Sequence, residues 1–238
     1  MKWKKKKIGQ ELKKMYEAPE PVGKKEFLKQ FDTCYLSMGQ FMWQQFWYIK
    51  KWMWFISAGV FLFGAVLSGS LDRETVWVLC ALVPYLALTF LAESGKSRAY
   101  RMDELEYATR FSLKSLLLAR MGALGICHGA ILFLLFLCMN TGFLPKPVDL
   151  FYVIVPYLLT VCLGLKFLRR FRGKETVYIS VGIPVFVSLC MVMINQMFPV
   201  IYGIAMVRVW ALACVFVIFF TGKEAALLIK ETEELAWN

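Results

Sequence analysis

The stretch from Val177 to Met197 reads VYISVGIPVFVSLCMVMINQM and contains no Asp, Glu, Lys or Arg. As an α-helix it would be about 31 Å long, which matches the ~30 Å hydrocarbon layer of a bilayer. The chain has six such apolar stretches: Trp52–Gly69, Val76–Ala92, Leu116–Met139, Leu150–Leu165, Val177–Met197 and Val200–Thr221. The sequence therefore predicts an all-α, polytopic membrane protein with six transmembrane helices.

Positive charge is concentrated between alternate apolar stretches. The chain has 238 residues, of which 59% are hydrophobic, and a formal net charge of +11. Of its 28 Lys and Arg residues, all but Arg73, Lys146 and Arg208 belong to four segments. These segments are residues 1–51, 93–120, 166–176 and 222–238. Because Lys and Arg collect on the cytoplasmic side, we expect a multi-pass protein of the plasma (inner) membrane with cytoplasmic N- and C-termini.

The basic N-terminal region points to lipid as a partner. The run Lys4–Lys7 lies between Trp3 and Ile8, in a chain that the apolar stretches anchor in a bilayer. A basic segment beside a membrane attracts anionic headgroups. We therefore expect contact with anionic lipid and no binding of nucleic acid.

Enzyme chemistry is not expected from this chain. The apolar stretches contain no Asp or Glu, and the seven cysteines form no C-x-x-C pair, so no metal site, cofactor site or catalytic site is predicted. His128 is the only histidine and is expected to hydrogen-bond between helices. Gly95-Lys96-Ser97 resembles the end of a nucleotide-binding loop, but Phe90 stands where that loop requires glycine.

An amphipathic helix is predicted before the first span. Residues 1–36 form a basic cytoplasmic segment, and residues 37–51 read SMGQFMWQQFWYIKK. Trp and Tyr favour the headgroup level, so we expect residues 37–51 to lie in the inner interface through Phe41, Trp43, Trp47 and Tyr48. The alternative is a first span that begins near Phe41, but it would place Lys50 and Lys51 in hydrocarbon.

A second amphipathic helix is predicted within the transmembrane domain, residues 52–221, between the second and third spans. Residues 103–115 read DELEYATRFSLKS, and Glu106 and Arg110 have the i,i+4 spacing of a favourable ion pair. The charged face carries Asp103, Glu106, Arg110 and Lys114. Such a helix either binds a cytoplasmic partner or only covers the base of the bundle, since amphipathicity does not identify what it contacts. Residues 222–238 are expected to form a cytoplasmic tail.

The segment ELEYATRFSLK, residues 104–114, resembles the loop between the second and third spans of ABC type-2 exporter permeases. Ala108-Thr109 stands where that family often has Gly-Thr, whereas the proline that usually follows is absent, with Leu113 or Lys114 in its region. The resemblance implies a coupling helix that docks on a separate ATPase. Its contacts would be Asp103, Glu106, Arg110, Phe111 and Lys114.

The connection before the last span carries more polar residues than is usual within the hydrocarbon layer of a membrane. Polar and helix-breaking residues gather there, and the resemblance implies a short re-entrant helical hairpin on the outer side. Asn195, Gln196 and Arg208 would then face a pore or its outer rim. The alternative is a tight turn at Phe198-Pro199, with Arg208 extending to the headgroups.

Two functions are therefore open at the level of sequence. The first is the membrane-spanning permease subunit of an ABC-type exporter, paired with a second permease chain as a homo- or heterodimer and with ATP-binding cassette ATPases. It would be a subunit without catalytic residues of its own. The alternative is a non-transporting membrane sensor, immunity or regulatory protein that binds a cytoplasmic partner.

Overall fold

The computed structural model describes residues 37–70, 76–100, 113–139, 149–171 and 173–234. The chain divides into two units, Met1–Ser37 and Met38–Asn238.

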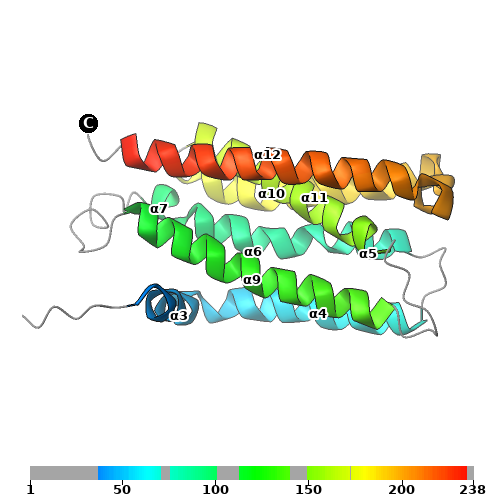
Figure 1. The fold of residues 1–238 in the computed structure, drawn as a ribbon, viewed down its shortest axis with the longest axis horizontal. Helices are drawn as coiled ribbons and strands as arrows, with labels where there is room; N and C mark the ends of the chain where they lie inside the picture. The colour runs from blue at the N-terminus through cyan, green and yellow to red at the C-terminus, as the bar shows by residue number, and fades with distance from the viewer. Residues whose placement is uncertain (1–36, 71–75, 101–112, 140–148, 172, 235–238) are drawn as a thin grey trace, which may run out of the picture. The chain divides into compact units, whose positions relative to one another are not determined.

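Every regular element in the described residues is helical, as Figure 1 shows. The α-helices are α3 (Met38–Tyr48), α4 (Lys51–Ser70), α5 (Val76–Leu82), α6 (Pro84–Ser94), α7 (Lys96–Ala99), α9 (Leu113–Met139), α10 (Asp149–Arg170), α11 (Glu175–Met197) and α12 (Val207–Glu234). Two short 3₁₀ helices, η2 (Pro199–Tyr202) and η3 (Ile204–Met206), connect α11 to α12.

The described residues contain five helical segments that are long and apolar enough to cross a membrane. One of them is α5 together with α6, and a sixth is obtained if α3 and α4 count as one bent span. Large apolar side chains such as Leu212, Val215 and Phe219 are exposed on the outside of α12, where lipid can cover them. The predicted all-α, multi-pass membrane architecture is therefore confirmed.

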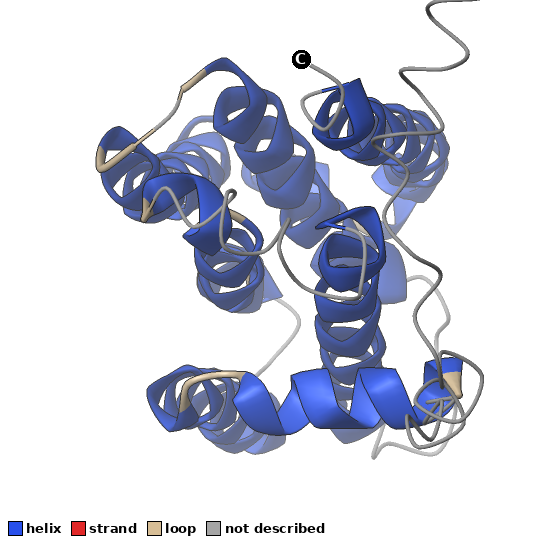
Figure 2. Ribbon diagram, turned by 90° about the vertical axis from the view of Figure 1, so that its left-hand side faces the viewer, coloured by secondary structure: helices blue, strands red, loops and turns tan. Residues whose placement is uncertain are grey.

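The helix before the first span is separate from it. The axes of α3 and α4 differ by 87° across a short break at Ile49 and Lys50. In Figure 2, α3 lies across the other helices, which are seen nearly along their axes. This bend confirms a separate helix at residues 38–48 and excludes a first span that continues straight from Phe41.

Helix α10 is central to the packing, because it contacts α5, α6, α9, α11 and α12. Its approach to α6 is close at Gly164, where a Cβ atom would overlap the side chain of Leu91. Leu91 and Leu165 are fully buried in this region. Small residues that let helix backbones approach are typical of packing inside membranes.

The last span differs from its predicted bounds, Val200–Thr221. Helix α12 begins seven residues later, because Pro199 and Gly203 favour turns over a regular helix. It then continues to Glu234 without a break, so the predicted tail is largely the end of this helix. A helix of 28 residues is about 42 Å long, which exceeds the hydrocarbon thickness.

Candidate functional site

Helices α3, α7 and the start of α9 meet at one end of the bundle, together with the ends of α10 and α12. We call this the basic end. Figure 2 views the molecule from this side. Its basic side chains include Lys50, Lys51, Lys96, Lys114, Arg120, Lys166, Arg169, Arg170, Lys174 and Lys230. In the part of the chain that the structure describes, Arg208 is the only Lys or Arg at the opposite end.

Arg120 joins three helices at the basic end. Its Nε donates to Oε1 of Gln45 on α3 at 3.3 Å, and its Nη1 donates to Oγ of Ser97 on α7 at 3.1 Å. Its guanidinium also lies 5.8 Å from the ring centre of Tyr48. Arg120 is only 7% exposed, so these contacts take the place of water around a charge that is otherwise costly to bury.

A second cation, the Lys96 ammonium, lies over the ring of Tyr48. The Lys96 ammonium lies 5.0 Å from the centre of the Tyr48 ring, and its nitrogen is 3.4 Å from Oε2 of Glu93. Glu93 is 2% exposed and is the last residue but one of α6. The contact between Lys96 and Tyr48 therefore links α3 to the junction of α6 and α7.

The predicted interfacial residues divide between two faces of α3. Phe41 is 4% exposed and packs inward, and Met42 lies near the α9 backbone at Gly122. In contrast, Trp43, Trp47 and Tyr48 are more than half exposed. An inward apolar face and an outward Trp and Tyr face agree with an amphipathic helix, and placement of the outward face among headgroups stays a prediction.

In sequence, four of the five predicted coupling residues come between α7 and α9, the two helices that the Arg120–Ser97 hydrogen bond connects. Asp103, Glu106, Arg110 and Phe111 lie outside the described residues, whereas Lys114 is the second residue of α9 and is partly buried. Helix α7 ends at Ala99 and α9 begins at Leu113. The hydrogen bond from Arg120 to Ser97 therefore joins the chain on both sides of the predicted coupling segment.

A second polar contact at the basic end joins α10 to α12. The guanidinium of Arg169 donates from Nη1 to Glu224 at 2.7 Å and pairs through Nε with Glu231 at 2.8 Å. The two glutamates are separated by two turns of α12, so one arginine fixes the register of both helices. The contact also places the last residues of α10 and of α12 at the same end of the bundle, as the positive charge of both segments predicts.

A chain of hydrogen bonds crosses the middle of the bundle through four helices. His128 on α9 is fully buried, with Nε2 3.0 Å from Oγ1 of Thr89 on α6 and Nδ1 3.0 Å from the hydroxyl of Tyr157 on α10. Oγ1 of Thr89 also lies 3.4 Å from Oγ of Ser57 on α4. The predicted hydrogen bonding of His128 between helices is therefore confirmed.

One arrangement of protons gives Thr89, His128 and Tyr157 a hydrogen-bond partner at each of these contacts. The Thr89 hydroxyl donates to the Leu86 carbonyl at 2.9 Å, so it accepts from Nε2–H of His128. Nδ1 of the neutral imidazole then accepts from the Tyr157 hydroxyl. A fully paired neutral network of this kind holds helices together without placing a charge in the bilayer.

The opposite end of the bundle contains an aromatic cluster, Tyr152, Tyr202 and Trp210, around the 3₁₀ turns. Tyr152 donates from its hydroxyl to the Gly203 carbonyl at 3.0 Å, and Trp210 donates from Nε1 to the Ile201 carbonyl at 3.0 Å. The ring centres of Tyr152 and Trp210 are 5.2 Å apart. Cys80 and Met191 pack against the same cluster.

The connection before the last span is neither a single tight turn at Phe198-Pro199 nor a hairpin of two α-helices. Helix α11 continues to Met197 and α12 begins at Val207, so the connection consists of two short 3₁₀ turns rather than a helical hairpin. Tyr152 and Trp210 hold these turns against the bundle through their hydrogen bonds, and re-entry of the connection into the membrane stays a prediction. Of the predicted rim residues, Asn195 is half-buried, while Gln196 and Arg208 are exposed. Their role at a pore stays a prediction.

Sequence reasoning missed the partners in these networks. Arg120 could have been noticed as a charge inside the first turns of an apolar stretch, which requires a partner. Gln45, Thr89 and Tyr157 carry no signal in the sequence that distinguishes them from other polar residues of the predicted helices. Comparison with known protein families, curated proteins and solved structures found no match for this chain.

Proposed function

We propose that this chain is the membrane-spanning permease subunit of an ABC-type exporter, coupled through residues 103–115 to a separate ATPase. The observation that carries the proposal is the bridge made by Arg120. It binds Ser97 before the coupling segment and Gln45 on α3, and it belongs to α9, which begins directly after that segment.

The bridge supports a mechanical role for the coupling segment. A partner that moves this segment moves the end of α7 and the start of α9 together, because Arg120 ties them. Helix α9 has 27 residues and is about 40 Å long, so displacement at its start is transmitted across the membrane. Helix α3 would move with α9, because Gln45 accepts a hydrogen bond from Arg120. The first three spans would then shift as a group.

The proposal includes an assembly and an orientation. Two permease chains, identical or different, would each bind an ATP-binding cassette ATPase that supplies all catalytic residues. The basic end faces the cytoplasm of the plasma (inner) membrane and contacts anionic headgroups. Reporter fusions should then place Arg170 and Lys230 inside, and Asp72 and Lys146 outside; an external Arg170 would overturn the orientation.

The deciding experiment alters two predicted coupling residues that follow each other in the chain. The tagged protein is purified from membranes of its own host, and associated ATPase subunits are identified by mass spectrometry. Phe111→Ala combined with Arg110→Glu should abolish ATPase copurification and the ATP hydrolysis of the complex, because interface energy is concentrated in few residues. Membrane expression should be unchanged.

A matched control keeps the same chemistry at the same end of the molecule. Tyr178→Ala combined with Lys174→Glu also removes one aromatic ring and reverses one charge, at exposed positions of α11 and its N-terminal flank. This variant should retain the ATPase. Normal copurification and hydrolysis in the Phe111 and Arg110 variant would reject the exporter proposal, and a copurifying signalling or transcription factor would favour a regulatory protein.

A further inference from the structure

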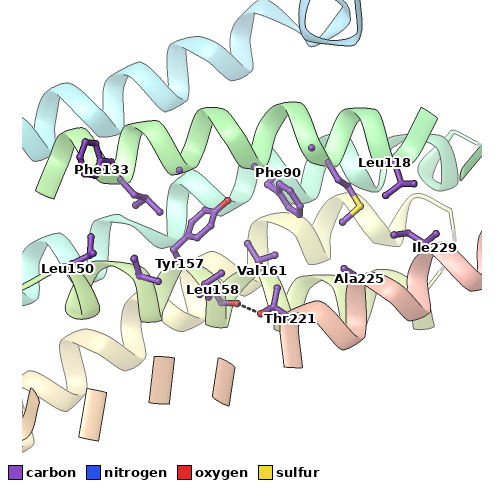
Figure 3. Close-up of a pocket in the computed structure, with 16 residues that line it drawn as sticks. Phe90, Leu118, Phe133, Leu150, Tyr157, Leu158, Val161, Thr221, Ala225 and Ile229 are labelled. Carbon is purple, nitrogen blue, oxygen red and sulfur yellow. Dashed lines mark hydrogen bonds between the residues drawn. The ribbon is translucent and has the colours of Figure 1, made fainter. Parts of the chain in front are cut away.

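A cavity of about 650 Å³ opens between α9, α10 and α12, with Phe90 of α6 at its back. We call it the crevice. Figure 3 shows its lining, which extends from Leu150 and Phe133 at one end to Leu118 and Ile229 at the other. The latter pair lies toward the basic end, since Leu118 is near the start of α9 and Ile229 near the end of α12.

Three glycines on α9, which have no side chain, leave the space of the crevice open. Gly122, Gly125 and Gly129 line it, and a Cβ atom added at Gly125 or Gly129 would meet no other atom within 4 Å. Both of these glycines are exposed. The described helices therefore leave this face of α9 uncovered, and the space can hold a larger group without movement of the backbone.

The lining offers no free hydrogen-bond donor to an occupant. The protons of its two hydroxyl groups are already donated, by Thr221 to the Val217 carbonyl at 2.7 Å and by Tyr157 to His128. The remaining lining is apolar. A polar ligand would lose its hydrogen bonds on entry, whereas a hydrocarbon chain would lose none.

The dimensions and charges favour one kind of hydrocarbon ligand. From Leu118 to Phe133 the α9 axis rises about 22 Å, whereas the hydrocarbon of one leaflet is about 15 Å thick. The crevice is therefore long enough for an acyl chain of one leaflet. At the basic end, Lys114 lies one turn before Leu118, and Lys230 follows Ile229. Lysines at this level attract an anionic headgroup.

We propose that the crevice binds one acyl chain of an anionic phospholipid, whose phosphate lies near Lys114 and Lys230. This inference goes beyond the proposed function, because it holds whether or not the chain couples to an ATPase. A second copy of the chain packed through the α9 glycines is the competing occupant, since small residues also favour contacts between helices.

The test uses the full-length chain in vesicles of phosphatidylcholine with phosphatidylglycerol that carries a photoactivatable group on one acyl chain. After irradiation, labelled peptides are mapped by mass spectrometry. Label should be concentrated on α9 and α12 residues of the crevice, with little on the exposed faces of α4 and α11. Equal labelling of all lipid-facing helices would overturn the proposal.

Filling the crevice provides the second arm. Gly125→Leu with Gly129→Leu should reduce crevice labelling about tenfold, because the new side chains occupy the space of the acyl chain. Gly59→Leu with Gly182→Leu is the matched control, since both glycines are exposed, meet nothing within 4 Å and lie outside the crevice. The control should label as the unaltered chain does, and unchanged labelling of the filled variant would reject the site.

Headgroup selectivity is tested separately and does not depend on the leucine variants folding. Lys114→Gln with Lys230→Gln should lower the preference for phosphatidylglycerol over phosphatidylcholine by about tenfold, with the acyl chain still labelling the crevice. An unchanged preference would overturn the headgroup assignment. Interchain disulfide formation by Gly129→Cys in unlabelled vesicles would identify a second copy as the occupant and overturn the lipid proposal.

Discussion

The two ends of the helical bundle are held together by different chemistry. At the basic end, Arg120 and Arg169 connect four helices and α7 through hydrogen bonds, ion pairs and a contact with an aromatic ring. At the opposite end, Tyr152, Tyr202 and Trp210 pack ring against ring and donate to backbone carbonyls.

This difference indicates which end can move. The partly exposed charges of Arg169 and Glu231 can exchange each other for water at little cost, whereas interlocked rings lose dispersion and burial as soon as they separate. The aromatic cluster is therefore the more fixed end of the bundle.

The largest effect is expected at the fixed end. Trp210→Ala removes a 7% exposed ring that contacts both tyrosines and anchors the 3₁₀ turns, so it should destabilise the protein by about 3–5 kcal/mol. Thermal unfolding in detergent measures the loss. Trp52→Ala, at a 71% exposed position, is the control and should change stability little. Similar losses for both would contradict a packed, rigid cluster.

A close helix contact tests whether packing also matters toward the basic end. Gly164→Ala places a methyl group against Leu91 between α10 and α6 and should cost about 1–3 kcal/mol. Gly182→Ala adds the same methyl group where nothing lies within 4 Å. If the two variants unfold at the same temperature, α6 and α10 do not approach as closely as described.

Release of α3 should cost less overall but expose a specific segment. Arg120→Met keeps much of the apolar stem and removes the bonds to Gln45 and Ser97, for a loss of about 1–2 kcal/mol. Trypsin cleavage at Lys50 or Lys51 should become roughly tenfold faster. Arg208→Met, at the opposite end, should leave the cleavage rate unaltered. Unchanged cleavage in Arg120→Met would show that apolar contacts alone hold α3.

The smallest effect is expected from the ion pairs between α10 and α12. Arg169 is one-quarter exposed, so Arg169→Gln should lower stability by about 1 kcal/mol or less at low salt. The difference should shrink in high salt, because mobile ions screen exposed charges. Arg170→Gln removes a neighbouring exposed charge as a control. A loss that is independent of salt would indicate that packing of the Arg169 stem matters more than its charge.

The sequence was sufficient for the architecture because hydrophobic length and charge asymmetry are local signals. The predicted apolar stretches match the bounds of helices to within a few residues except for the last, where apolar residues from Val200 to Met206 conceal the turns that Pro199 and Gly203 produce. Separation of α3 was also predictable, since Lys50 and Lys51 interrupt an apolar run.

Contacts between distant segments were not predictable. Nothing in the sequence pairs Gln45 with Arg120, or His128 with Thr89 and Tyr157, because partners are chosen by packing of whole helices. The crevice was missed for a related reason. Glycines at 122, 125 and 129 are compatible with a tight helix contact or an open face, and only the positions of α10 and α12 distinguish the two.

The bend after α3 has a consequence for how the chain is made. Gln45 and its partner Arg120 are 75 residues apart, which at about 5–20 residues per second corresponds to roughly 4–15 s of synthesis. Throughout that interval α3 has left the ribosome but its docking surface on α9 does not yet exist. Its exposed Trp and Tyr side chains are those that would let it lie at the membrane surface in the meantime, as the sequence predicts. Docking of the first described helix is therefore a late step of assembly, completed only after the third span has been inserted.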